Sequence, residues 1–333
     1  MHKKVLMNVE TVYTANAFAI DNQVYVAAGS ETTPEVFLHK FGTDETSLVA
    51  DCPGGVMSFV PQQQSKGHFF SVMGLFPPFV GAEAGIFRHV KNAASWDSKK
   101  VVELPFAHRC DILQFEGKEY LFSASCSQFK ENPLDWSKAG EVFVSELNEK
   151  GLAEEPKLVK KLFRNHGMLK AKMNGKDTIF VSGAEGIYYF DFEDRNFVPK
   201  QYFDHEVSEF GIIDIDGDGK EELVTIEPFH GNTLNVYKFD DKKWELKYQD
   251  ELWFGHGLSC GTFNGEAIIV VGNRRGPLTL CLYKAKDIAK GVFNKEVLEE
   301  EAGPTQTQVF SDKGVDYILS ANQLKKEVAI YYL

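Results

Sequence analysis

The stretch that decides the fold is GKDTIFVSGAEGIYYFDF, residues 175–192. A glycine turn leads into two runs rich in branched and aromatic residues, KDTIFVSG and GIYYFDF, with a short turn between them. Glycine supplies the positive φ of a tight hairpin, and continuous apolar runs of this length are typical of strands buried on both faces. The same pattern begins at seven turn residues spaced 44 to 58 positions apart: Asn22, Gly67, Gly117, Gly175, Gly219, Gly265 and Gly314.

Each repeat holds material for four strands. One run precedes the turn (CDILQF, 110–115), two follow it, and a fourth fills the gap before the next repeat (KLVKKLF, 157–163). The last repeat stops on its third strand at Leu333, and KKVLMNV (3–9) is left over at the other end, so pairing it with 327–333 closes the ring. The sequence therefore predicts an all-β, seven-bladed β-propeller, with four antiparallel strands per blade and a single domain over residues 1–333. A pair of β-sandwiches or an open solenoid accounts less well for seven units and a matching terminal strand.

Composition narrows the classes of partner. The formal net charge of −12 disfavours nucleic acid and anionic membrane surfaces as partners. No apolar run is long enough to span a membrane, and the first residues lack the apolar core of a signal peptide. Five unclustered cysteines fit reduced thiols. We therefore expect a cytoplasmic protein with a small-molecule partner, and the sequence leaves a homo-oligomer open.

Repeat five carries an acidic loop at its hairpin turn. Carboxylates at Asp214, Asp216, Asp218 and Glu222, with the backbone carbonyl of Lys220, form an all-oxygen set suited to Ca²⁺. The loop resembles the calcium loops of integrin-type and related bacterial propellers (FG-GAP/VCBS-type). That resemblance implies an ion that fastens a hairpin. The alternative is an Asx-turn hairpin whose acids are only solvated.

Three histidines share one register. His108, His166 and His256 each lie nine residues before their turn glycine, where the first strand of a blade begins at the mouth of the channel. Together with Glu209, or with His230, they make a plausible site for Zn²⁺, Mn²⁺ or Fe²⁺. The alternative is a water-filled channel lined with neutral histidines.

Other polar and aromatic residues are expected at the same mouth. The candidate catalytic residues are His230, Glu227, Arg109 and Tyr13. The candidate substrate-binding residues are Arg274, Arg275, Glu185, Asn273 and Phe229. A wall for stacking sugars is expected from Phe76, Phe79, Phe229, Trp253 and Phe254.

The acidic loop, followed by Glu-Pro-Phe-His-Gly-Asn (227–232) on a propeller with channel histidines, is similar to the aldos-2-ulose dehydratase family. The resemblance is strongest over about residues 205–260. It implies a metal-dependent carbohydrate lyase or dehydratase that performs β-elimination on a keto-sugar such as 1,5-anhydro-D-fructose. By architecture alone, the chain is also similar to intracellular oligogalacturonate lyases. In this interpretation the histidines bind the metal, His230 or Glu227 is the base, and Arg109, Arg274 or Arg275 holds the sugar.

Two other interpretations remain open from the sequence. The same site would suit a sugar isomerase, epimerase or hydrolase, and a propeller can also bind a glycan or a protein without catalysis. Nucleotide-binding glycine motifs, the GxSxG nucleophile motif and the HExxH metal motif are absent from the sequence.

Overall fold

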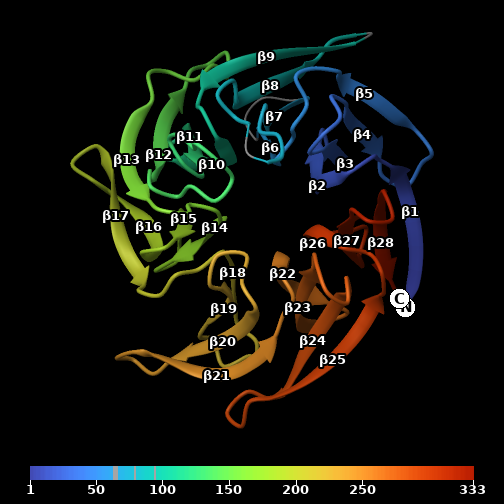
Figure 1. The fold of residues 1–333 in the computed structure, drawn as a ribbon, viewed down its shortest axis with the longest axis vertical. Helices are drawn as coiled ribbons and strands as arrows, with labels where there is room; N and C mark the ends of the chain where they lie inside the picture. Colours follow the sequence, from blue (N-terminus) through green and yellow to red (C-terminus); the bar gives the residue numbers. More distant parts are fainter. Residues whose placement is uncertain (63–66, 79, 94) are drawn as a thin grey trace. The chain divides into compact units, whose positions relative to one another are not determined.

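The computed structural model describes residues 1–62, 67–78, 80–93 and 95–333. The chain is an all-β propeller with seven blades, each an antiparallel sheet of four strands (Figure 1). It divides into two compact units, which are described separately below. The terminal unit comprises Met1–Ala15 and Glu206–Leu333, and the central unit comprises Asn16–His205. The predicted fold class is confirmed, whereas the prediction of a single domain stays a prediction.

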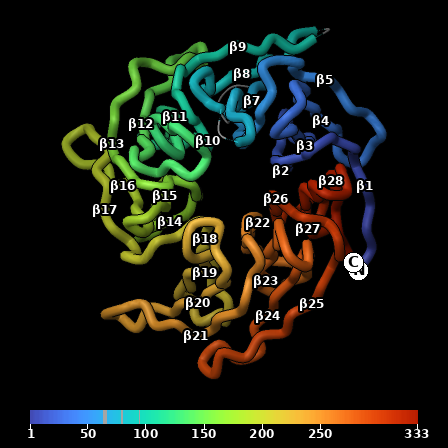
Figure 2. Tube along the Cα trace, viewed as in Figure 1, coloured from blue at the N-terminus to red at the C-terminus, as the bar shows by residue number. Residues whose placement is uncertain are grey.

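The central unit contains four sheets, and within each sheet the four strands lie side by side in the order in which they follow one another in the chain (Figure 2). The first sheet begins with β2, whose first residues belong to the terminal unit, and it comprises β2 (Val12–Ile20), β3 (Gln23–Ser30), β4 (Val36–Lys40) and β5 (Thr46–Ala50). The second comprises β6 (Ser58–Pro61), β7 (His68–Met73), β8 (Gly85–Lys91) and β9 (Trp96–Glu103). The third comprises β10 (Ala107–Phe115), β11 (Lys118–Ser125), β12 (Gly140–Leu147) and β13 (Lys157–Leu162), and the fourth β14 (Met168–Met173), β15 (Lys176–Gly183), β16 (Gly186–Glu193) and β17 (Asn196–Phe203).

The terminal unit contains three sheets. The first comprises β18 (Glu209–Ile213), β19 (Glu222–Glu227), β20 (Thr233–Phe239) and β21 (Trp244–Glu251). The second comprises β22 (Gly255–Phe263), β23 (Glu266–Asn273), β24 (Leu280–Asp287) and β25 (Val292–Glu299). The third comprises β26 (Pro304–Asp312), β27 (Val315–Asn322), β28 (Glu327–Tyr332) and β1 (His2–Asn8).

Strand β1 is the outer strand of the last sheet. It pairs antiparallel with β28, from His2 opposite Tyr332 to Asn8 opposite Glu327, and the two chain ends lie together (Figure 1). The pairing predicted between residues 3–9 and 327–333 is confirmed. It covers the backbone edge that β28 would otherwise expose.

Apolar side chains between neighbouring sheets hold each unit together. In the central unit one cluster joins the third and fourth sheets through Phe122, Val142, Ile179 and Phe190. In the terminal unit a comparable cluster joins the first two sheets; it includes Val224, Leu234, Ile269 and Tyr283. These residues belong to the runs that the sequence marks as strands buried on both faces, and their burial packs neighbouring sheets of each unit against one another.

Candidate functional site

A tyrosine and a histidine from the terminal unit form a buried hydrogen-bonded pair. The Tyr13 hydroxyl lies 3.1 Å from Nε2 of His256, and Nδ1 of His256 lies 2.6 Å from the carbonyl oxygen of Thr305. A carbonyl can only accept, so Nδ1 carries the proton; when the ring is neutral, Nε2 is therefore the acceptor for the Tyr13 hydroxyl. Tyr13 is 6% exposed and His256 is 1% exposed. The pair is therefore shielded from bulk water and fixed in one tautomer.

An arginine is fixed against the tyrosine of this pair. The guanidinium carbon of Arg274 lies 5.4 Å from the centre of the Tyr13 ring. Its Nε and Nη2 both donate to Oε1 of Gln323, at 3.3 and 3.0 Å, and Nε2 of Gln323 donates to the Val12 carbonyl. These contacts hold a positive charge beside the Tyr13 phenol, where it favours negative charge. Arg275 is exposed, with its guanidinium 4.5 Å from the centre of the Phe254 ring.

His230 is the second histidine of this region. Its ring stacks on Phe229 at 4.0 Å between centres and lies 4.6 Å from Phe254 and 5.1 Å from His256. Its φ of 47° lies in the left-handed region, which is uncommon for a residue other than glycine. The backbone amide of His230 donates to Ser208 Oγ at 3.1 Å. The turn thus keeps a strained backbone in place to present an imidazole beside His256.

Three predicted residues of the terminal unit make mainly structural contacts. Glu227 ends β19 and accepts the hydroxyls of Thr225 and Tyr237, at 2.5 and 3.2 Å. Asn273 is buried. Its side-chain amide accepts a hydrogen bond from the backbone N–H of Trp253 and donates one to the Thr279 hydroxyl. Glu209 begins β18, where it pairs with Ile226. The carboxylate of Glu227 is therefore already held by two hydroxyls of its own sheet.

The central unit brings together the two other predicted histidines. The rings of His108 and His166 lie 4.3 Å apart, and each residue is 3% exposed. Arg109 donates from Nη1 to the carbonyl oxygen of Met57 at 3.1 Å, and Glu185 accepts the backbone amide of Phe163. Phe79 lies outside the described residues. The structure describes the two histidine pairs within separate units, so a single ion shared by His108, His166 and His256 stays a prediction.

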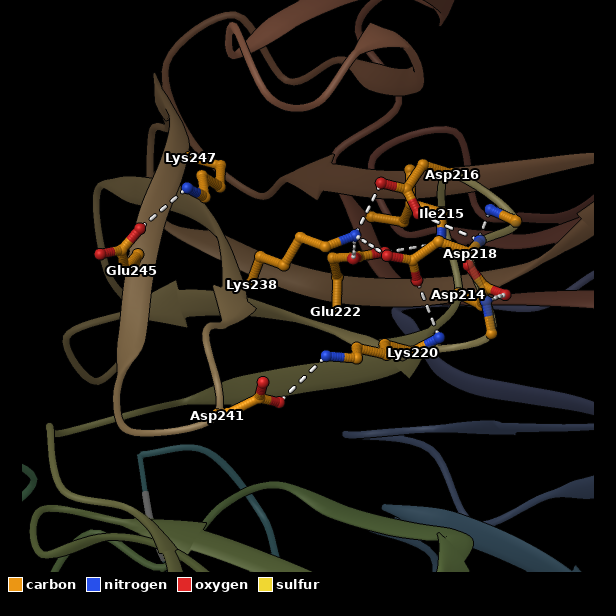
Figure 3. Close-up of polar contacts among 12 residues, drawn as sticks. Asp214, Ile215, Asp216, Asp218, Lys220, Glu222, Lys238, Asp241, Glu245 and Lys247 are labelled. Atoms are coloured by element: carbon orange, nitrogen blue, oxygen red, sulfur yellow. Dashed lines mark hydrogen bonds and ion pairs between the residues drawn. The ribbon is translucent and has the colours of Figure 1, made fainter.

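The acidic loop lies between β18 and β19. Figure 3 shows its side chains and the lysine beside them. One carboxylate oxygen from each of Asp214, Asp216 and Asp218 lies within 4.8 Å of the others, a spacing that a metal ion could span. However, the ammonium of Lys238, on β20, lies 2.7 Å from Asp216, 2.9 Å from Asp218 and 2.8 Å from the buried Glu222. The donor atoms suit calcium, but a cation from the chain itself already lies among them.

Sequence reasoning named most residues of the terminal-unit site but not their connections. Lys238 was missed, although the register that pairs Leu223 with Tyr237 puts the next residue, Lys238, beside Glu222. The sequence does contain one signal for the Tyr13–His256 pair: each residue lies near the start of the first strand of its sheet.

Comparisons with known proteins establish the fold. No family model matches the chain, and no curated protein matches it. Among solved structures, the chain is similar to the Cps50 (Swd1) β-propeller domain of Myceliophteria thermophila, with a TM-score of 0.64, 6% identity and 100% of both chains covered. It is also similar to a candidate 6-phosphogluconolactonase from Bacteroides uniformis (TM-score 0.59, 10% identity, 96% of this chain and 91% of that chain) and to the Dos1 propeller (0.58, 10%, 92% and 75%). At these identities the likeness concerns the fold, and function has to be argued from the site.

Proposed function

We propose that this protein is a carbohydrate lyase that removes a proton next to the carbonyl group of a keto-sugar and expels the substituent on the adjacent carbon. The observation that carries the proposal is the buried Tyr13–His256 pair with its fixed tautomer. A positioned acid–base pair is what this reaction requires. The resemblance to aldos-2-ulose dehydratases over residues 205–260 gives the substrate class, with 1,5-anhydro-D-fructose as the first compound to test.

The proposed elimination has two stages. A base takes the proton from the carbon next to the carbonyl, the C–H electron pair forms a carbon–carbon double bond, and the carbonyl oxygen takes up negative charge. The enolate then returns its electrons, and the β-substituent leaves as water or an alcohol after receiving a proton. Tyr13 would exchange a proton with the substrate, His256 would exchange one with Tyr13, and Arg274 would hold a negative or hydroxyl group beside them.

A thiol mechanism has little support in the same region. Cys260 lies on β22, four residues after His256, and burial raises the pKa of its thiol to about 12. A nucleophilic cysteine needs a lowered thiol pKa, usually from a neighbouring cation or imidazole. Acid–base chemistry through Tyr13 and His256 is therefore the better explanation of the site.

The transition metal predicted from the sequence is part of the proposal. Within the terminal unit, His256 and His230 are the residues that would hold it. His256 fits this role because its Nδ1–H is bonded to a backbone carbonyl, which orients Nε2 as metal-ligating histidines require. A metal on Nε2 would take the lone pair that otherwise accepts from Tyr13, so the proton exchange between Tyr13 and His256 belongs to the protein without a metal at His256. A bound Zn²⁺, Mn²⁺ or Fe²⁺ would supply polarisation of the substrate carbonyl.

The proposal is tested by incubating the protein with keto-sugars and following the absorbance of an unsaturated carbonyl product. We expect the wild-type protein to turn over a keto-sugar and the Tyr13→Phe variant to lose this activity. Exchange of the α-hydrogen with deuterated water, without a new absorbance, would point to an isomerase or epimerase on the same site. If a sugar binds but none of the sugars gives a new absorbance or hydrogen exchange, the protein is a binding propeller and the proposal is wrong.

A further inference from the structure

We propose that the ammonium of Lys238 is the resident cation of the acidic loop, and that Lys238 and a calcium ion exclude each other there. The loop has the acidic spacing of a calcium site, yet its carboxylates converge on a lysine from the neighbouring strand (Figure 3). The inference is independent of the catalytic proposal, because it concerns a hairpin turn and not the Tyr13–His256 pair.

Hydrogen bonds and ion pairs account for both carboxylate oxygens of each of the three aspartates in the loop. Asp214 accepts the backbone amides of Gly217 and Gly219, at 2.8 and 2.9 Å. Asp216 and Asp218 each accept a backbone amide on one oxygen and contact Lys238 Nζ with the other. The loop is therefore folded by its own amides, with the lysine as the shared positive charge.

Glu222 shows why this position needs a cation. Its side chain is fully buried; one oxygen accepts the Ile215 amide at 2.7 Å, and the other contacts Lys238 Nζ at 2.8 Å. Burial raises the pKa of Glu222, while the bonds from Lys238 and Ile215 oppose that rise. For Lys238, burial lowers the pKa, but the bonds to Asp216, Asp218 and Glu222 outweigh it and raise the pKa above its ordinary value. The lysine is thus held in its charged form.

Two cations cannot share this position. A calcium ion bound to Asp216, Asp218 and Glu222 would lie about 2.4 Å from their oxygens. The Lys238 ammonium already contacts the same three carboxylates at 2.7 to 2.9 Å. Two positive charges so close would repel strongly, so calcium can enter only if Lys238 leaves.

The experiment compares calcium binding by the wild-type chain and by Lys238→Met, which keeps an unbranched apolar side chain and removes the charge. Binding is measured by isothermal titration calorimetry with CaCl₂, and Tm is measured in CaCl₂ and in EDTA. We expect the wild type to bind with a Kd weaker than about 1 mM, with the same Tm in both solutions. We expect Lys238→Met to bind calcium at least about tenfold more tightly and to regain Tm when calcium is added.

Lys247→Met is the matched control. Lys247 lies on β21, and its ammonium pairs with Glu245 away from the acidic cluster (Figure 3). This variant should bind calcium with the wild-type affinity. If Lys238→Met does not fold, the titration of the wild type still decides. One calcium per wild-type chain with a Kd below about 10 μM, lost in Asp216→Asn, overturns the proposal.

Discussion

The Tyr13 hydroxyl meets Nε2 of His256 at 3.1 Å, although 243 residues separate the two in the chain. The opposite ring nitrogen is fixed by Thr305, and Arg274 lies against the Tyr13 ring. The geometry gives Tyr13 one proton acceptor and one neighbouring positive charge. Both favour transfer of its proton during a reaction.

Replacing Tyr13 by phenylalanine should remove the acid–base group and keep the ring. Positioned acid–base groups contribute about 10²–10⁴ in rate, so we expect kcat/KM to fall at least about 100-fold and one limb of the pH–rate profile to disappear. Tyr332→Phe, on the half-buried end of β28, is the control and should keep full activity. Full activity in Tyr13→Phe would leave the pair without a catalytic role.

Arg274 should act on substrate binding more than on the chemical step. Changing it to glutamine removes the charge that Gln323 holds over Tyr13, and we expect KM to rise about tenfold, or about 1.4 kcal/mol, with a smaller change in kcat. Lysine should rescue only part of this loss, because it cannot reproduce the two donors directed at Gln323. Steady-state kinetics checks both variants, and Arg195→Gln, at an exposed turn, is the control.

Gly231 holds the turn that presents His230. A Cβ added at Gly231 would lie 2.1 Å from the carbonyl of Glu227, whereas one added at Gly265 would meet no atom within 4 Å. Gly231→Ala should therefore cost about 3 kcal/mol of unfolding free energy through backbone displacement. Gly265→Ala should cost about 1 kcal/mol, because its φ of +78° strains a side chain. Urea unfolding of both variants tests the difference, and equal losses would contradict it.

Burial of His89 should make the protein less stable at low pH. Its ring lies between the Ser71 and Ser98 hydroxyls, and burial lowers its pKa to about 3. The unfolded chain takes up this proton near pH 6.5 and the folded chain does not, so the contribution is present above pH 6.5 and is lost as pH falls toward 3. Between pH 7 and pH 5 the loss should be about 2 kcal/mol. Urea unfolding of wild type and His89→Gln should show their stability difference narrowing by that amount, and a constant difference would exclude it.

The predicted transition metal has a direct test. Protein purified without chelator should contain Zn, Mn or Fe at close to one ion per chain by elemental analysis. If one ion is bound by the histidines named from the sequence, His108→Ala, His166→Ala and His256→Ala should each lose it together with turnover. Metal retained in all three variants, or calcium alone in the wild type, contradicts that prediction.

Local patterns in the sequence predict most of the fold. Turn glycines such as Gly117 and Gly175, with φ of 79° and 76°, stand where the sequence expects hairpins, and the apolar runs after them became buried strands. Glu222 and Lys238 are neighbours through hairpin register, so their contact could also have been predicted. Tyr13 and His256 share a position near the start of a first strand, but their hydrogen bond could not be predicted, because it depends on how side chains from distant segments orient.

The pairing of β1 with β28 also sets the order in which the protein can fold during synthesis. The first strand leaves the ribosome long before its partner at 327–332 exists, so its backbone groups stay without their native partner until those residues have been made. The last sheet is therefore completed after translation of the other blades. Slowing elongation should lengthen the time for which this segment is open to chaperones or proteases.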